Sequence, residues 1–172
     1  MDVSRVRGLF EGIASGYETH RPLLAEAVVR TQGAIIELGM GEGSTRALHA
    51  VSDLTDRTVW SYDHDLSWFS RFVELRSERH LLACVRSWDD CPLESMLWSL
   101  AFVDHAPAER RIVELRRLAW RAHVVVVHDT EDPAYGYDAA YDLFTYRLDD
   151  KRFPQWTTAL SNYVDVSRWS IA

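Results

Sequence analysis

The strongest constraint on the fold of this chain is a regular alternation of short apolar runs with segments of helical periodicity. Five apolar runs, rich in β-branched and aromatic residues, lie at 34–36, 58–62, 81–85, 100–103 and 124–127. Apolar residues recur at helical spacing in 21–31, 44–51, 66–76 and 112–121, and a further segment at 93–99 leads into the fourth run. With a helix after each strand, this pattern predicts a Rossmann-like, mostly parallel, doubly wound α/β sheet with helices on both faces.

The last of these runs consists of four valines, so both of its faces should be buried, as in the centre of a parallel sheet. Beyond Pro133 and Gly136 the alternation weakens. There, the residues at 144–148 and 156–160 are predicted to pair as antiparallel strands at the edge of the sheet. The carboxyl-terminal part of the chain is therefore expected to depart from the parallel pattern.

Length and composition favour one domain. A chain of 172 residues with 47% hydrophobic content is long enough to bury one sizeable core, so we expect a single domain over 1–172. In it, 1–31 would form an N-terminal helical cap and 137–172 the C-terminal edge of the sheet. No run of about 18 apolar residues is present, and charged residues interrupt 1–16, which fits neither a membrane span nor a signal peptide. We expect a soluble, cytoplasmic protein without a membrane partner.

Charge and cysteine content also bear on the partners. The formal net charge of -7 argues against extended binding to phosphate backbones, which needs a basic surface, so nucleic acid is not expected as a partner. The arginines within 110–121 alternate with apolar residues at helical spacing and are interpreted as the solvated face of a helix. Cys84 and Cys91 match neither a metal-binding pair nor a disulfide framework, which favours reduced thiols and leaves a disulfide open.

The turn between the first apolar run and its helix carries a glycine-rich motif, Glu37-Leu38-Gly39-Met40-Gly41-Glu42-Gly43. Glycines in such a turn permit positive φ and let a ligand approach the bare backbone, while the helix start offers free N–H groups. The spacing is GxGxG rather than the GxGxxG of dinucleotide sites, and Glu42 places negative charge where a pyrophosphate would approach. Asp63 ends the second run, where a carboxylate can accept hydrogen bonds from both ribose hydroxyls. These features predict an adenosine cofactor without phosphates.

With these residues the chain resembles class I S-adenosylmethionine-dependent methyltransferases over about 31–128, and the glycine-rich motif is the most specific part of the resemblance. The resemblance implies S-adenosylmethionine as the cofactor, with Glu37 near its methionine part, Asp63 on the ribose and the turn at 87–89 near adenine. Trp88 would equally serve as a core aromatic. The cofactor-binding residues expected on this basis are Glu37, Gly39, Met40, Gly41, Gly43, Asp63, His64, Ser87, Trp88 and Asp104.

The fourth and fifth runs end in the motifs Phe102-Val103-Asp104-His105 and Val127-His128-Asp129-Thr130. Both motifs resemble the corresponding strand ends of small-molecule O-methyltransferases of the catechol O-methyltransferase kind. The resemblance implies that Asp104 and Asp129 bind Mg²⁺, an ion that prefers oxygen ligands and acidifies a bound hydroxyl. The expected metal ligands are therefore these two aspartates.

Two departures from that pattern make a metal-free reaction the favoured alternative. Pro107 stands where the subgroup has a lysine, and Thr130 stands where it has an amide ligand. Without a metal, methyl transfer requires in-line placement of the acceptor and a base for its proton. His105 and His128, together with Asp104, are then the expected catalytic residues, because a histidine accepts a proton near neutral pH.

The predicted function is methyl transfer from S-adenosylmethionine to a small-molecule acceptor, with oxygen as the favoured nucleophile. The alternatives are a non-catalytic module that keeps the adenosine pocket and an NAD-dependent oxidoreductase of the same fold. Loops at the strand ends, or a second subunit in a homodimer, would complete the acceptor pocket. His20, within 17–22, is expected in a lid over the cofactor. Tyr135, Tyr137 and Tyr141 would either line the acceptor pocket or pack at the sheet edge.

Overall fold

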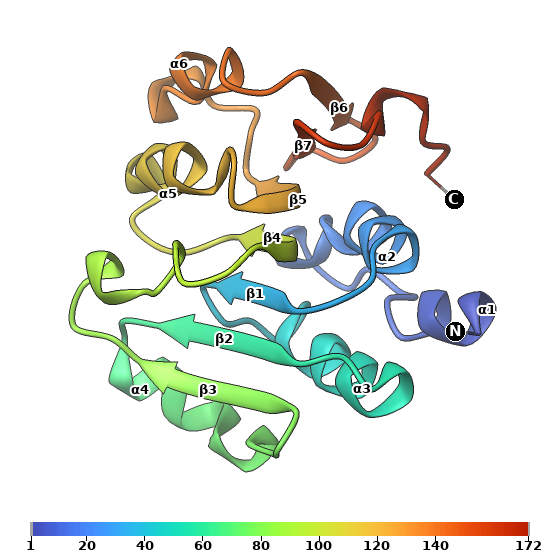
Figure 1. Cartoon of the computed structure of the whole chain (residues 1–172), viewed down its shortest axis with the longest axis vertical. Coiled ribbons are helices and arrows are strands. Elements are labelled where there is room, and N and C mark those ends of the chain that lie inside the picture. Colours follow the sequence, from blue (N-terminus) through green and yellow to red (C-terminus); the bar gives the residue numbers. More distant parts are fainter. Residues whose placement is uncertain (1, 172) are drawn as a thin grey trace.

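The computed structural model describes residues 2–171, which form a seven-stranded sheet with helices on both faces (Figure 1). The strands are β1 (Ile35–Leu38), β2 (Val59–Asp63), β3 (His80–Cys84), β4 (Trp98–Val103), β5 (Ala122–His128), β6 (Tyr146–Asp150) and β7 (Thr157–Ser161). The helices are α1 (Val3–Gly8), α2 (Arg21–Arg30), α3 (Thr45–Thr55), α4 (Leu66–Phe69), α5 (Arg111–Leu118) and α6 (Asp138–Tyr141), and short 3-10 turns join some of the elements. The predicted Rossmann-like α/β fold is confirmed.

The strands lie in the order β3-β2-β1-β4-β5-β7-β6. Strands β1 to β5 are parallel, whereas β7 is antiparallel to both of its neighbours. The predicted antiparallel pair is thus confirmed, although β7 lies inside the sheet and only β6 forms the edge on this side. The chain first runs outward from β1 to β3 and then returns to β4 on the other side of β1. The carboxyl ends of β1 and β4 therefore frame a topological switch point, where sheets of this kind bind ligands.

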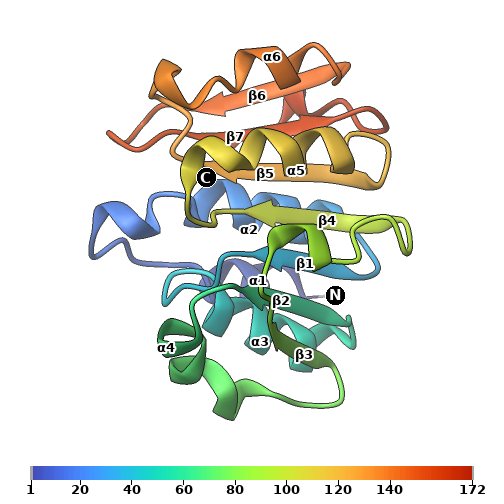
Figure 2. The same ribbon diagram turned by 90° about the vertical axis from the view of Figure 1, so that its left-hand side faces the viewer.

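Two apolar layers enclose the sheet. Helices α1, α2 and α3 pack on one face, and α5 and α6 cover the other, which faces the viewer in Figure 2. The valine run of β5 contributes to both layers: Val124 and Val126 belong to the first, Val125 and Val127 to the second, and all four are fully buried. This burial on both faces is the reason for the unbroken apolar run in the sequence.

The expectation that a helix follows each strand is wrong between β3 and β4. The described connection holds a 3-10 turn at Trp88–Asp90 and further turns, and β4 begins at Trp98, inside the 93–99 segment. The indole of Trp98 is fully buried and donates its N–H to the carbonyl oxygen of Leu93 at 2.9 Å. The 93–99 segment is thus a turn that packs against Trp98, the first residue of β4, and it is not a helix.

Candidate functional site

A cavity of about 600 Å³ opens at the carboxyl ends of β1, β2, β4 and β5. Residues of the 15–20 segment, which leads into α2, form part of its wall. Of the residues predicted from the sequence, the following line the cavity: Gly39, Met40, Gly41, Gly43, Asp63, His64, Asp104, His105, His128 and Asp129. Glu37, Ser87 and Trp88 do not. Most of the residues predicted from the strand ends therefore lie together around this cavity.

Gly39 allows the ends of β1 and β4 to meet. Its backbone φ of +92° lies in the left-handed region, and a Cβ atom at this position would lie 2.5 Å from the backbone nitrogen of His105. The N–H of Gly39 donates to the carbonyl of Tyr62 at 2.9 Å, and that of Asp104 donates to Leu38 at 2.8 Å. Only glycine satisfies both the conformation and the approach. This residue therefore sets the distance between the glycine-rich loop and Asp104.

Asp63 holds the glycine-rich loop from the end of β2. One of its carboxylate oxygens accepts the Met40 N–H at 2.9 Å, and the other accepts the Asp65 N–H at 2.9 Å. The indole of Trp68 fixes the same loop by donating to the carbonyl oxygen of Met40 at 2.6 Å. Asp63 is largely buried yet lines the cavity, and each carboxylate oxygen can accept a second hydrogen bond. The side chain is thus able to bind hydroxyl groups of a ligand.

Glu37 lies beneath this loop and is fully buried. Its Oε1 atom accepts hydrogen bonds from the hydroxyls of Ser44 at 2.5 Å and Thr45 at 3.0 Å, which tie β1 to the start of α3. Its Oε2 atom has no hydrogen-bond partner among the described residues. Burial raises the pKa of Glu37 to about 7 against the opposing effect of these hydroxyls. The carboxyl group therefore supports the loop from below and has no direct place in the cavity wall.

This buried carboxyl makes stability depend on pH. Because the folded protein binds the Glu37 proton more tightly than the unfolded chain, stability is lost as pH rises from the ordinary pKa of 4.5 through about 7. We expect Glu37→Gln to gain stability over the wild type as pH increases from 5 to 8, by up to about 3 kcal/mol. Denaturant unfolding at several pH values measures the gain. Glu42→Gln, which removes a half-exposed carboxylate of the same loop, is the control, and a gain independent of pH would contradict the prediction.

Arg111 occupies the place between the two predicted metal ligands. Its guanidinium is buried and lies 3.1 Å from a carboxylate oxygen of Asp104 and 3.1 Å from one of Asp129. The interpretation of this arginine as part of a solvated helix face is wrong, because it points from the first turn of α5 under the strand ends. A fixed positive charge already links the two aspartates that were expected to share Mg²⁺. The position between the two carboxylates is therefore already taken by a cationic side chain of the protein.

His128 joins Asp104 at the floor of the cavity. Its Nδ1 atom lies 3.3 Å from each carboxylate oxygen of Asp104, and its Nε2 atom lies 2.8 Å from the hydroxyl of Thr19. Burial by itself lowers the pKa of His128, but the hydrogen bond and negative charge of Asp104 outweigh it and raise the pKa above its ordinary value. Burial likewise opposes ionisation of Asp104, whose pKa is nevertheless lowered by His128 and Arg111. The two side chains stabilise each other as an ion pair.

His20, Asp104 and His128 form a cluster at the cavity floor. The sequence predicted His20 only as part of a lid over the cofactor. It directly precedes α2, is buried, and has no hydrogen-bond partner on either ring nitrogen among the described residues. Its Nδ1 atom lies 3.9 Å from Asp104, and its ring packs edge-on against His128 with centroids 4.9 Å apart. Burial, assisted by His128, lowers the pKa of His20 to about 3, so the ring is neutral near neutral pH.

His105 is held by the protein on both sides. Its Nε2 atom lies 3.0 Å from a carboxylate oxygen of the buried Glu114, and its Nδ1 atom lies 3.3 Å from the carbonyl of Ala106. Trp88 stacks on the imidazole with ring centroids 4.2 Å apart and is itself buried, which matches its interpretation as a core aromatic. Ser87 caps the 3-10 turn before Trp88 by accepting the N–H of Asp89. Both ring nitrogens of His105 therefore already face acceptor groups of the protein.

Tyr135, Tyr137 and Tyr141, which follow β5, pack in the protein interior, which was one of their two predicted roles. Tyr137 and Tyr141 are buried in the apolar layer of α5 and α6, and Tyr135 packs against that layer. None of the three lines the cavity. Their aromatic character therefore stabilises the edge of the sheet and does not shape the pocket.

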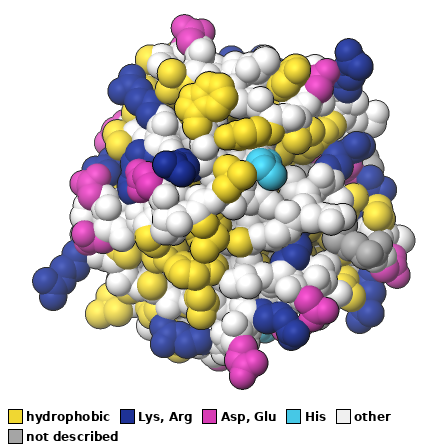
Figure 3. Space-filling model, viewed as in Figure 1, with side chains coloured by type: hydrophobic (Ala, Val, Ile, Leu, Met, Phe, Trp, Pro, Cys, Tyr) yellow, Lys and Arg dark blue, Asp and Glu magenta, His cyan; other side chains and the backbone are white. Residues whose placement is uncertain are grey.

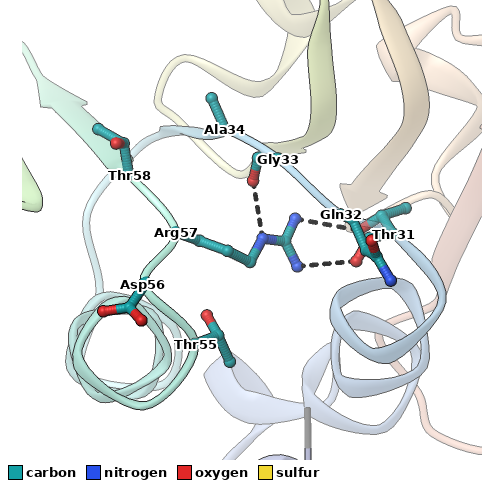
Figure 4. Close-up of a pocket in the computed structure, with 8 residues that line it drawn as sticks. All are labelled: Thr31, Gln32, Gly33, Ala34, Thr55, Asp56, Arg57 and Thr58. Carbon is teal, nitrogen blue, oxygen red and sulfur yellow. Dashed lines mark hydrogen bonds between the residues drawn. The ribbon is translucent and has the colours of Figure 1, made fainter.

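A second hollow of about 470 Å³ lies at the opposite end of the sheet, lined by 31–34 and 55–58 (Figure 4). The guanidinium of Arg57 lies buried beneath it and donates to the carbonyls of Gly33, Val28 and Thr31 and to the hydroxyls of Thr31 and Ser99. These bonds join the end of α2, the approach to β1 and the start of β4. Because this arginine is already fully engaged, the hollow is a structural junction.

Comparison with known proteins identifies the fold. No protein-family model and no curated protein sequence matches the chain. Among solved structures, a ribosomal protein L11 methylase from Lactobacillus delbrueckii subsp. bulgaricus is similar with a TM-score of 0.62 and 13% identity, over 85% of this chain and 79% of that one. An O-methyltransferase from Bacillus cereus in complex with SAH has a TM-score of 0.60 and 12% identity, over 93% and 89%. The chain has the class I methyltransferase fold.

The same fold also occurs in proteins with macromolecular partners. A methyltransferase in complex with the Haloferax volcanii Trm112 activator is similar with a TM-score of 0.60 and 11% identity, over 94% of this chain and 95% of that one. The METTL16 methyltransferase domain and the ribosomal protein methylase are further neighbours. The exclusion of nucleic acid as a partner on the basis of net charge is therefore wrong. Net charge averages over the surface, and both signs alternate on the face in Figure 3, so it does not restrict a local contact.

Within residues 2–171, no helix combines the length and the apolar character needed to cross a membrane.

Proposed function

We propose that this protein is an S-adenosylmethionine-dependent methyltransferase that transfers the methyl group to an oxygen atom of a small-molecule acceptor. The observation that carries the proposal is the position of Asp63, which holds the glycine-rich loop by Met40 and keeps acceptor capacity toward the cavity. A carboxylate in this place suits the two ribose hydroxyls of an adenosine. Glu42 lines the same cavity and disfavours a pyrophosphate. A sulfonium cofactor without phosphates fits both side chains.

The acceptor is assigned to the other end of the cavity, beside Asp104 and His128. A volume of about 600 Å³ suits a cofactor with a small acceptor, and the wall contributed by 15–20 limits access from that side. Methyl transfer from a sulfonium requires an aligned nucleophile and a group that takes its proton. The ionised carboxylate of Asp104, held by His128, is assigned as that group, because both side chains line the cavity together.

The cofactor assignment is tested by calorimetric titration with S-adenosylmethionine, its demethylated product and NAD. We expect micromolar affinity for the first two ligands and no binding of NAD. Asp63→Ala should weaken binding of the demethylated product by at least about tenfold, because charge-assisted hydrogen bonds to the ribose contribute roughly 1.5 to 3 kcal/mol each.

Asp65→Ala is the matched control, since Asp65 lines the same cavity but uses its side chain to cap α4 at the Trp68 N–H. Tighter binding of NAD than of S-adenosylmethionine would overturn the cofactor assignment. Equal affinity of the Asp63→Ala variant and the wild type would show that the ribose is held elsewhere. Cofactor binding without turnover of any hydroxylated acceptor would favour a non-catalytic binding module.

A further inference from the structure

The cluster at the cavity floor brings together one ligand atom each from three separate parts of the chain. His20 precedes α2, Asp104 follows β4, and His128 ends β5. An imidazole nitrogen of each histidine and a carboxylate oxygen of the aspartate all lie within 4.8 Å of one another. Two ligands of one metal ion, each bound at about 2 Å, lie roughly 3 to 4 Å apart, so a closing of about 1 to 2 Å would place all three on one ion.

The hydrogen bonds of Thr19 decide the proton position on His128. The Thr19 hydroxyl has one hydrogen and lies 3.0 Å from the carbonyl of Gly16 and 3.1 Å from that of Gln155, and both carbonyls only accept. Thr19 therefore donates to a carbonyl and accepts the Nε2–H of His128 at 2.8 Å. The Nδ1 atom then faces both oxygens of Asp104 at 3.3 Å. A cation belongs between them, either a proton on Nδ1 or a metal ion.

His20 provides the independent observation that distinguishes these two possibilities. A proton between His128 and Asp104 satisfies those two residues but leaves both ring nitrogens of His20 without a partner among the described residues. Burying a polar group without a hydrogen bond costs free energy, and buried polar groups normally have a partner. His20 nevertheless lies at the cavity floor, within 3.9 Å of Asp104. A ligand shared with the other two side chains satisfies this imidazole as well.

We propose that His20, Asp104 and His128 bind a divalent transition-metal ion of the Zn²⁺ or Fe²⁺ class. Two imidazoles and one carboxylate suit such ions, and three protein ligands leave open positions for an exogenous oxygen ligand. Thr19 acts as the outer partner that fixes the tautomer of His128. The site differs from the predicted Mg²⁺ site at Asp104 and Asp129, because Arg111 already lies between those two carboxylates.

Arg111 leaves room for this ion. The guanidinium bonds the Oδ1 atom of Asp104, whereas the Oδ2 atom is the one nearest His20. Asp104 thus presents Oδ1 to the arginine and to His128, and Oδ2 to both histidines. The proposal does not depend on methyl transfer, because metal binding is measured directly and independently of the cofactor.

The test uses the purified full chain after chelation, with Co²⁺ as a spectroscopic probe and Zn²⁺ as a competitor. We expect one Co²⁺ per chain, seen as a visible absorption band that Zn²⁺ abolishes. His20→Ala should weaken binding at least a hundredfold, and since it removes no hydrogen bond between described residues, it is expected to fold. Thr19→Val should weaken binding about tenfold by releasing the tautomer of His128.

His64→Ala is the matched control, because His64 lines the same cavity but lies outside the cluster. Its affinity for Co²⁺ should stay within about twofold of the wild type. Absence of saturable binding in the folded wild type, or equal affinity of the wild type and His20→Ala, would overturn the proposal. Circular dichroism of each variant establishes that the compared proteins are folded.

Discussion

Replacing Gly39 with alanine is expected to destabilise the protein by about 3 kcal/mol or more. An alanine at φ +92° is strained by about 1 to 2 kcal/mol, and its Cβ atom would lie 2.5 Å from the backbone nitrogen of His105. Backbone cannot give way as a flexible side chain does, so the ends of β1 and β4 must separate. In a chain of this size the melting temperature should fall by roughly 10 °C.

Gly136→Ala is the control that separates the cost of a left-handed backbone conformation from the cost of a steric clash. Gly136 also has a left-handed φ, of +71°, but no heavy atom lies within 4 Å of its added Cβ atom. This variant should lose only about 1 to 2 kcal/mol. Denaturant unfolding of the two variants measures the difference. Equal losses in both would show that the close approach of β1 and β4 contributes nothing beyond backbone conformation.

Replacing His128 with alanine is expected to lower kcat about a hundredfold or more. The variant removes the imidazole that holds Asp104 at the cavity, and positioned acid–base groups contribute roughly 10² to 10⁴ in rate. Cofactor affinity should change little, because the predicted ribose contact is Asp63. Transfer of labelled methyl groups to catechol and other hydroxylated aromatic rings measures kcat.

His49→Ala is the control for the loss of a histidine. His49 lies on α3 and stacks on His80, away from the cavity. It should retain the kcat of the wild type. A His128→Ala variant that folds, binds cofactor and turns over as fast as His49→Ala would remove His128 from the reaction.

The strand ends could be predicted because they depend on local pattern and one general rule. Parallel strands place their carboxyl ends along one edge, so Asp63, Asp104 and His128 were expected to converge before any contact was known. The valines of β5 signalled burial on both faces in the same way. Such features need only the order of the elements along the chain, which hydrophobic periodicity reports well.

The remaining features depend on contacts between distant segments, which periodicity does not report. Arg111 has the spacing of a solvated helix face, and only the position of Asp104 and Asp129 under the first turn of α5 reveals its pairing. His20 precedes a helix with Pro22 in its first turn, which predicts the helix start but not the partner. Trp88 could not be assigned between core and ligand, because the stacking ring of His105 is distant in sequence.

The junction at Arg57 has a mechanical consequence for the opposite end of the molecule. Through Val28 and Thr31 it clamps the far end of α2, a helix of 10 residues and about 15 Å in length. The helix is therefore anchored at its carboxyl end, and His20 lies at its amino end, at the cavity floor. A helix held in this way resists displacement, whereas the 15–19 segment in front of it is free of such a clamp by Arg57. Because Thr19 belongs to that segment and contacts the Nε2 atom of His128, movement of the segment would also affect the histidine cluster.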